Sequence, residues 1–277
     1  MPLVGSELLV EARRAGVGVG AFNVIGIEHA EALVAGAQTA GRPVILQISE
    51  NAAKFHRGLP PIGRATLEIA RAATVPTVVH LDHATDETLI DQAIDLGFTS
   101  VMYDGATLDY AENVARTAAV VQRAHDAGVW VEAELGEVGG KDGAHAPGVK
   151  TDPREAAGFV AATGVDALAI AVGSSHAMTE RTAALDLPRI AEIAAAVTVP
   201  LVLHGSSGVP DAAIAAGIAA GLTKINVSTH LNKVFSAALR DYLATNTAVV
   251  DPRKYLGAAR DTLATEIARL IGVIDGR

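Results

Sequence analysis

The sequence contains no cysteine, and this absence excludes several kinds of chemistry. Disulfides, thiolate metal sites and thiol nucleophiles all require cysteine, so a transition-metal site in this chain has to use histidine and carboxylate ligands. Aromatic residues are also rare, at 4% of the 277 residues, whereas 50% of the chain is hydrophobic. We therefore expect a core built mainly of alanine, valine, isoleucine and leucine.

Positive charge and long apolar runs are scarce as well. The formal net charge is -9 at pH 7, which argues against a nucleic-acid-binding surface. No run approaches the roughly 18 apolar residues of a membrane-spanning helix. Glu7, Glu11, Arg13 and Arg14 interrupt the N-terminal stretch in which a signal peptide would lie. The sequence thus predicts a cytoplasmic protein with no nucleic-acid partner and no membrane partner.

What the chain does have is a regular alternation of strand-like and helical segments. Eight short, mainly apolar runs are typical of strands: residues 19–24, 43–49, 77–83, 100–105, 130–136, 167–173, 200–207 and 224–229. Eight β/α units without a break in composition predict an α/β fold, a (β/α)8 (TIM) barrel, formed as a single domain by residues 1–277. A doubly wound open sheet is the alternative.

The tail from Asp251 onward exceeds what the eighth barrel helix needs. Leu256, Leu263, Ile267 and Leu270 recur at helical spacing, which predicts an extra C-terminal helix with one apolar face. That face is expected to cap the barrel or to bind another subunit.

Polar side chains gather at the C-terminal ends of the predicted strands. Every strand end, or the loop directly after it, contributes at least one: Asn23, Ser49, Asp82, His83, Asp104, Glu134, His176, His204 and Asn226. Barrel enzymes build their active sites at this end. The set therefore predicts one site to which all eight strands contribute.

Histidines from three different strand ends predict a metal centre. Three neutral imidazoles, from His83, His176 and His204, would leave a zinc ion one open position for substrate. Buried carboxylates need a partner, so Asp104 and Glu134 are expected to bind a second, looser cation or to orient the histidines. Structural salt bridges beneath the loops are the alternative for these two.

Asp82 precedes the first of these histidines and is placed to accept and donate a proton. The loops after the seventh and eighth strands predict a phosphate site, because barrels commonly bind phosphate there. Residues 205–207 supply a glycine and hydroxyls, and residues 226–229 close the eighth strand. Either loop alone is also compatible with an ordinary strand-to-helix turn. Together with zinc, these groups suggest Lewis-acid catalysis on a carbonyl of a sugar phosphate, in which the ion stabilises an enediolate.

An ordered set of motifs resembles the class II, metal-dependent ketose-bisphosphate aldolases along nearly the whole chain. The motifs are GAFN at 20–23, HLDH at 80–83, MYDG at 102–105, EAELG at 132–136, AVGSSH at 171–176, HGSSG at 204–208 and KINV at 224–227. The resemblance implies a lyase of carbohydrate metabolism and glycolysis. Such an enzyme reversibly cleaves fructose 1,6-bisphosphate or tagatose 1,6-bisphosphate to dihydroxyacetone phosphate and glyceraldehyde 3-phosphate.

The resemblance also implies roles for individual residues. His83, His176 and His204 would hold the catalytic zinc, and Asp82 would exchange the proton with the C4 oxygen of the substrate. The family also binds an extra divalent ion at the positions of Asp104 and Glu134.

Substrate contacts follow in the same way. Dihydroxyacetone phosphate would lie against Gly205, Ser206, Ser207, Asn226, Val227, Ser228 and Thr229. A monovalent cation, Na+ or K+, often accompanies that phosphate. Asn23 and Ser49 would line the aldehyde side, and Arg260 is the candidate for the second phosphate. In some members this arginine crosses a subunit contact, which together with the apolar tail predicts a homo-oligomer, a dimer or tetramer.

Two positions depart from the family pattern. Ala177 follows the second zinc histidine, where the family usually has glycine and where the backbone approaches the phosphate. The glycine-rich segment 136–152 predicts a lid, in which a family glutamate removes the C3 proton of dihydroxyacetone phosphate. Asp142 stands in place of that glutamate and reaches one methylene less far.

Other readings stay open. A Schiff-base aldolase would need a desolvated lysine inside the barrel, and Lys224, the only lysine in a predicted strand, is expected at the wrong, N-terminal end. An aldolase for another ketose phosphate would also release dihydroxyacetone phosphate. A sugar-phosphate-binding barrel with reduced turnover is the remaining alternative, and the departures at Ala177 and Asp142 motivate it.

Overall fold

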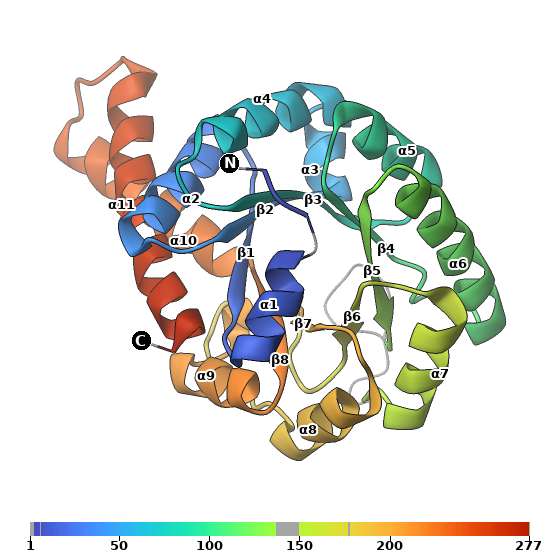
Figure 1. Cartoon of the computed structure of the whole chain (residues 1–277). Helices are drawn as coiled ribbons and strands as arrows, with labels where there is room; N and C mark the ends of the chain where they lie inside the picture. The colour runs from blue at the N-terminus through green and yellow to red at the C-terminus, as the bar shows by residue number, and fades with distance from the viewer. Residues whose placement is uncertain (1–2, 6, 137–149, 177, 277) are drawn as a thin grey trace.

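The computed structural model describes residues 3–5, 7–136, 150–176 and 178–276. Eight parallel strands close into a barrel in chain order, and helices surround it (Figure 1). The strands are β1 Val19–Asn23, β2 Val44–Ser49, β3 Thr77–Ala84, β4 Ser100–Tyr103, β5 Trp130–Leu135, β6 Ala167–Ile170, β7 Leu201–Leu203 and β8 Leu222–Val227. Because β1 pairs with β8, the predicted (β/α)8 barrel is confirmed and the open sheet is wrong.

The sequence places all eight strands correctly but makes several too long. The strand β7 ends at Leu203, and a short 3-10 turn, Ser206–Gly208, follows it. Gly205 adopts a left-handed conformation, with φ of 67°, that turns the chain out of the barrel wall. After β8, the chain enters the next helix at Thr229. Backbone turns at these loops therefore shorten the strands that hydrophobic patterning predicts.

The helices are α1 Glu7–Ala15, α2 Ile27–Ala40, α3 Glu50–Phe55, α4 Leu59–Ala72, α5 Glu87–Leu96, α6 Tyr110–Asp126, α7 Pro153–Thr163, α8 Leu187–Ala196, α9 Asp211–Ala219, α10 Thr229–Thr245 and α11 Pro252–Asp275. Aspartates accept hydrogen bonds from backbone N–H groups in the first turns of several of these helices, among them Asp109 at α6 and Asp152 at α7. The barrel strands are thus joined by helices with well-defined starts.

The N-terminal half of the barrel interior is apolar. Leu9 and Ala12 of α1 pack against inward-facing side chains near the starts of the strands: Val19, Ala21, Ile45, Val78, Trp130, Ala167, Ala169 and Val202. Helix α1 therefore closes this end of the barrel. The other end, where the strands finish, carries the polar residues.

The predicted C-terminal helix is α11. Its residues Leu263, Ile267, Leu270 and Ile274 are buried, and the helix packs against α2 and α10. Gly36 of α2 allows a close approach, because a Cβ atom there would lie 2.6 Å from the carbonyl oxygen of Ala264. The apolar face of α11 thus covers the outside of the barrel wall beside α2.

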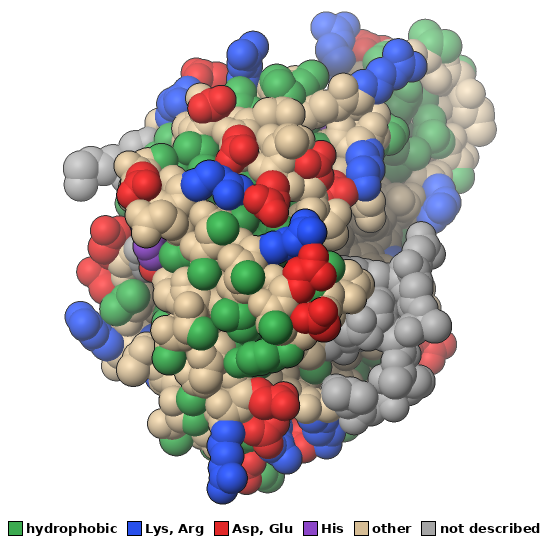
Figure 2. Space-filling view, turned by 90° about the vertical axis from the view of Figure 1, so that its right-hand side faces the viewer, with side chains coloured by type: hydrophobic (Ala, Val, Ile, Leu, Met, Phe, Trp, Pro, Cys, Tyr) green, Lys and Arg blue, Asp and Glu red, His purple; other side chains and the backbone are tan. Residues whose placement is uncertain are grey.

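The charged side chains on the surface are mixed in sign. Over the face formed by α5, α6 and α7, lysines and arginines alternate with acidic residues (Figure 2). Arg123 of α6 contacts Glu87 of α5 at 2.8 Å, and Arg116 contacts Glu112 at 2.7 Å. In the part of the chain that the structure describes, no helix has the length and apolarity needed to cross a bilayer.

Candidate metal centre and active site

The end of β3 presents two consecutive side chains to the same site. In a regular strand, Asp82 would face the interior and His83 the outside, because side chains alternate. His83 instead has a positive φ of 51°, and the register between β3 and β4 shifts between Leu81 and Ala84. This bulge breaks the alternation. It brings His83 into contact with the barrel's other polar side chains while Asp82 stays buried.

The structure brings together the three histidines that the sequence singles out. One possible ligand atom from each of His83, Glu134, His176 and His204 lies within 4.8 Å of the others. The ring centroids are 4.5 Å apart for His83 and His204, and 5.1 Å apart for His83 and His176. These side chains come from the ends of β3, β5 and β7 and from the loop after β6.

This donor set suits a zinc-like ion. Imidazole nitrogens and a carboxylate oxygen are typical zinc ligands, and a tetrahedral ion with bonds of about 2.1 Å would space its ligands by roughly 3.4 Å. The four groups therefore need only modest side-chain movement to reach one ion. The geometry fits the metal that the sequence predicts.

Two of the three histidines form hydrogen bonds with carboxylates. Asp104 Oδ2 lies 2.8 Å from His83 Nδ1, and Glu134 Oε2 lies 2.8 Å from His204 Nδ1. For Asp104, the expected role of orienting a histidine matches its contact with His83. Glu134 also belongs to the four-residue group that could hold the ion itself. The hydroxyl of Ser174 donates to the carbonyl oxygen of His204 at 2.6 Å, which fixes the backbone at the end of β7.

A second layer of charges lies beneath the metal group. Glu132 and Lys224 are both fully buried, and Lys224 Nζ lies 2.7 Å from Glu132 Oε2. The other oxygen, Glu132 Oε1, lies 2.9 Å from His204 Nε2. On the far side, Lys224 Nζ lies 3.4 Å from His80 Nε2, and His80 Nδ1 lies 2.7 Å from the hydroxyl of Ser100.

This layer revises the expectation for Lys224. The lysine lies inside the barrel, in the middle of β8 and two residues before Asn226, rather than at the strand's N-terminal end. Sequence reasoning did not select Glu132, although the alternation of Glu132 and Glu134 in β5 was the available signal that both face inward.

The buried charges shift several pKa values. Burial lowers the pKa of His204, but hydrogen bonds with Glu132 and Glu134 outweigh this effect and raise it to about 9. Burial and the charge of Lys224 lower the pKa of His80 to about 3, so His80 is neutral. Burial raises the pKa of Glu132, but Lys224 and His204 reverse this and hold it well below its usual value.

Asp82 is 3% exposed, and side-chain amides from β2 and β8 contact it. Its two carboxylate oxygens accept from Gln47 Nε2 and Asn226 Nδ2, each at 3.4 Å. Burial raises the pKa of Asp82, but the charges of His83, Lys224 and His204 outweigh it, so the net shift is downward. At neutral pH the carboxylate is therefore ionised and able to accept a proton.

The side-chain amides of Gln47 and Asn226 each have an oxygen atom without a hydrogen-bond donor among the described residues. Gln47 Nε2 donates to Asn23 Oδ1 at 2.7 Å. The oxygens Gln47 Oε1 and Asn226 Oδ1 are buried and have no hydrogen-bond partner among the described residues. Buried polar atoms are rarely left unpaired. They are suited to accept hydrogen bonds from hydroxyl groups of a ligand. Gln47 is not among the residues that the sequence predicts for the site.

Hydrogen bonds connect the loop after β7 to the loop after β8. The hydroxyl of Ser206 donates to the carbonyl oxygen of Asn226, and Ser207 Oγ accepts from the backbone N–H groups of Ser228 and His230, each at 3.2 Å. At Gly205, a Cβ atom would lie 2.6 Å from the carbonyl oxygen of Ser175. The loops are thus closely packed beside the metal group, with the Ser206 hydroxyl committed to the backbone.

The remaining predicted residues fall into two groups. Asp142 and Ala177 lie outside the described residues, as does segment 137–149 of the expected lid. Ser49 caps α3, since its hydroxyl accepts from the N–H of Ala52 at 3.1 Å. Arg260 lies on α11, where it contacts Glu31 at 2.9 Å and Asp261 at 3.0 Å. The structure does not bring Arg260 to the metal group of the same chain.

Comparisons with known proteins show the family of this chain. The family model for class II fructose-bisphosphate aldolase matches residues 5–276. A fructose-bisphosphate aldolase of Staphylococcus aureus is 42% identical over 269 residues, which cover 95% of this chain and 94% of the relative. One from Thermus caldophilus is 40% identical over 290 aligned positions, with the same coverage.

The solved structure of another aldolase has the same fold. The YdjI aldolase from Escherichia coli K12 superposes with a TM-score of 0.84 at 29% identity, covering 99% of this chain and 98% of the other. The chain therefore belongs to the class II fructose-bisphosphate aldolases and is an aldolase, a carbon–carbon lyase.

Proposed function

We propose that this aldolase reversibly cleaves fructose 1,6-bisphosphate or tagatose 1,6-bisphosphate, giving dihydroxyacetone phosphate and glyceraldehyde 3-phosphate, with a zinc ion at His83, His176 and His204. The observation that carries the proposal is the convergence of these imidazoles and Glu134 within 4.8 Å, beside an ionised Asp82. The relatives named fructose-bisphosphate aldolase favour the fructose isomer. The cytoplasmic location stays a prediction.

The metal would supply Lewis-acid polarisation of the substrate carbonyl. His83, His176 and His204 would hold it, and Asp104 would keep the His83 ring oriented through its hydrogen bond to Nδ1. A second divalent ion at Asp104 and Glu134, and a monovalent cation near the phosphate, remain proposals. Both carboxylates are engaged with histidines here, so a second ion would have to replace those contacts.

Asp82 would act on the C4 hydroxyl of the bound sugar. Its carboxylate takes the hydroxyl proton as the C3–C4 bond breaks, and returns it in the synthetic direction. Gln47 and Asn226 keep the carboxylate in place through their amide groups. Asp142 is proposed as the group that exchanges the proton at C3.

The phosphate of dihydroxyacetone phosphate would bind at residues 205–207 and 226–229, with the backbone N–H of Ala177 as a further contact. The close packing of these loops gives them a fixed shape, which lowers the cost of ordering on binding. Asn23 and Ser49 are proposed to line the aldehyde side. The amide oxygens of Gln47 and Asn226 add acceptors for sugar hydroxyls.

Steady-state assays with both bisphosphates test the proposal. Zinc-loaded protein is expected to release dihydroxyacetone phosphate from one isomer faster, to lose activity in EDTA, and to regain it with zinc. Borohydride with substrate is the matched test of the Schiff-base alternative at Lys224. Activity that survives EDTA and is lost on borohydride treatment would contradict the metal mechanism.

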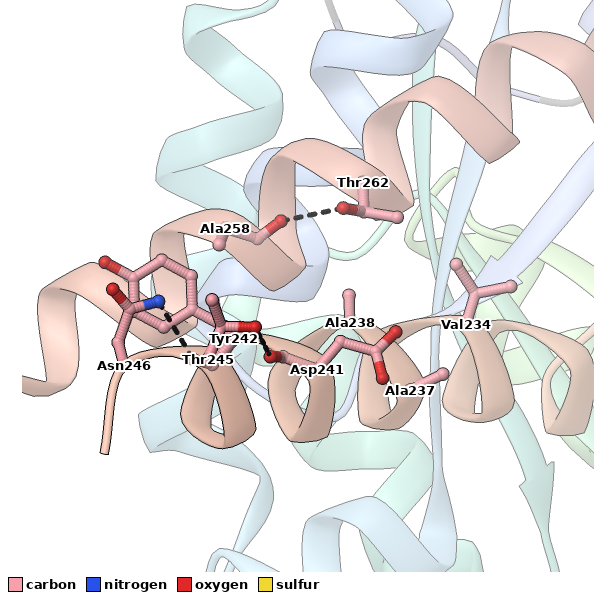
Figure 3. A pocket seen from close by; sticks show the side chains of 9 residues that line it. All are labelled: Val234, Ala237, Ala238, Asp241, Tyr242, Thr245, Asn246, Ala258 and Thr262. Carbon is pink, nitrogen blue, oxygen red and sulfur yellow. Dashed lines mark hydrogen bonds between the residues drawn. The ribbon is translucent and has the colours of Figure 1, made fainter. Parts of the chain in front are cut away.

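We also propose that a second copy of the chain binds along α10 and α11. Their hairpin projects beyond the ring of helices (Figure 1), and only Leu231 of the 17 residues of α10 is buried. A groove of about 620 Å³ runs between the two helices (Figure 3), lined by Val234, Ala237, Ala238, Asp241, Tyr242, Thr245, Asn246, Ala258 and Thr262. Nearby, Val250 is 91% exposed. The proposed reach of Arg260 to the second phosphate depends on this assembly.

Light scattering of the purified protein tests the assembly. A dimer or tetramer is expected, and Val250→Asp is expected to shift it toward the monomer. Ile27→Asp is the matched control, because Ile27 is an exposed apolar residue at the start of α2. A monomeric wild-type protein would contradict the proposal.

A further inference from the structure

The pair formed by Glu132 and Lys224 has no place in the proton transfers described above. Both side chains are fully buried inside the barrel. Burying two charges costs free energy that a close contact only partly returns, and apolar residues could fill the same space. Their position directly beneath His204 suggests what the pair does.

The hydrogen bonds of the pair define which atom carries each proton. An ammonium group can only donate, so Lys224 Nζ donates to Glu132 Oε2 at 2.7 Å. An ionised carboxylate can only accept, so the contact of 2.9 Å between Glu132 Oε1 and His204 Nε2 requires a proton on Nε2. The lysine thereby holds Glu132 in the orientation that receives the His204 proton.

The two nitrogens of His204 face different layers. Glu132 precedes Glu134 by two residues in β5, so it lies about 6.6 Å deeper along the strand. His204 Nε2 contacts the deeper carboxylate, whereas Nδ1 contacts Glu134, a member of the four-residue metal group. The nitrogen that points toward the proposed ion is therefore Nδ1, and its hydrogen bond with Glu134 would be replaced by the bond to the ion.

From these contacts we infer that Glu132 and Lys224 are positioning residues of the metal site, which keep the His204 proton on Nε2 and leave Nδ1 to bind the ion. This inference rests on the proposed zinc site. Partners of this kind fix the tautomer and the ring orientation of a metal-binding histidine, and their loss typically weakens metal binding by about 10- to 100-fold.

Substitution of Glu132 by glutamine tests the inference with little change of shape. Because Lys224 can only donate, the amide oxygen of the new side chain is expected to face Lys224, and its NH2 group then faces His204 Nε2. The NH2 group cannot accept the imidazole proton, which is therefore driven to Nδ1. We expect Glu132→Gln to weaken zinc binding about 10- to 100-fold in competition with a chromophoric chelator.

The double variant Glu132→Gln/Lys224→Met shows whether a loss of zinc affinity comes from the changed His204 tautomer or from a general disturbance of the site. Without the lysine, the amide oxygen can turn to His204 Nε2 and accept its proton again, so zinc affinity is expected to return to within about threefold of the wild type. Ser100→Ala is the matched control: it removes a buried hydrogen bond to His80 in the same layer without touching His204. It is expected to leave zinc affinity unchanged.

The outcomes distinguish this inference from the proposed function. Wild-type protein that binds no zinc overturns the proposed function. Wild-type binding with an unaffected Glu132→Gln variant, or without recovery in the double variant, overturns only the role of the pair. If Glu132→Gln fails to fold, nitrogen NMR of the zinc-loaded wild type labelled with 15N-histidine shows which nitrogen of His204 carries the proton. A protonated Nε2 on His204 supports the inference, and a protonated Nδ1 overturns it.

Discussion

The two halves of the barrel interior use the same eight strands but opposite kinds of side chain. In the N-terminal half, residues such as Ile45 and Val78 pack beneath α1. Two and four residues further along β3, the inward side chains are His80 and Asp82. The apolar half supports the strands, and the polar half at their C-terminal ends carries the candidate site.

The difference also concerns energy. Burial of Ile45 or Val78 stabilises the fold through removal of apolar surface from water. Burial of Glu132, Lys224 and His204 is tolerated only because each finds a close partner. Changes in the polar half should therefore affect chemistry or metal binding first, and changes in the apolar half should affect stability first.

The largest effect is expected for Asp82→Asn. Loss of the carboxylate removes the proton acceptor at C4 and should lower kcat about 1,000-fold. The free energy of unfolding of the metal-free protein should change by no more than about 1 kcal/mol. The new amide oxygen can still accept from Gln47 Nε2, and the new NH2 group can donate to Asn226 Oδ1, which has no partner among the described residues, once the Asn226 amide turns over. Turnover close to that of the wild type would contradict the role of Asp82.

Ile45→Ala makes the opposite change in the apolar half. Ile45 is 1% exposed, and truncation of such a side chain typically costs about 3 kcal/mol. Urea denaturation should show this loss, while zinc affinity and kcat of the folded protein stay within about twofold of the wild type. A parallel loss of zinc affinity would show that the two halves are not independent.

Sequence reasoning located the strand ends and the three histidines because both follow from local pattern. The spacing of apolar residues marks each strand, and parallel strands in a barrel bring their C-terminal ends together. The convergence of His83, His176 and His204 is thus a consequence of topology.

Features that depend on contacts between different strands or loops could not be predicted from the sequence. The bulge that turns His83 inward arises in the register between β3 and β4. Lys224 has a partner of opposite charge because β5 places Glu132 inside the barrel beside it. The hydrogen bond that the Ser206 hydroxyl donates to the Asn226 carbonyl oxygen likewise depends on the contact between two loops.

Asp104→Asn changes the polar half of the barrel interior and leaves Asp82, the proposed proton acceptor, unchanged. Asp104 Oδ2 is 2.8 Å from His83 Nδ1, and loss of the charge should weaken zinc binding about 10-fold, at the low end of the range for such partners. Asp109→Asn is the matched control, since asparagine also caps helices and Asp109 caps α6. Chelator competition should separate the two variants, and equal zinc affinities would contradict the role of Asp104.

The smallest effect is expected outside the barrel interior, where charges reach solvent. Glu266 of α11 contacts His230 at 2.6 Å and Arg269 at 2.7 Å. Burial raises the pKa of Glu266, but hydrogen bonds with Arg269 and His230 outweigh it and lower the pKa to about 2 from an ordinary 4.5. A depressed carboxyl pKa adds stability that is present above the unfolded value and is lost as pH falls toward the folded value.

Wild-type protein should therefore lose more unfolding free energy than Glu266→Gln between pH 5 and 2, a window set by the pKa values of 4.5 and about 2. Because Glu266 is partly exposed, the difference at pH 7 should stay below about 1 kcal/mol. Urea denaturation of both proteins at pH 7, 5 and 3 measures it. Parallel curves would mean that this cluster contributes nothing to acid stability.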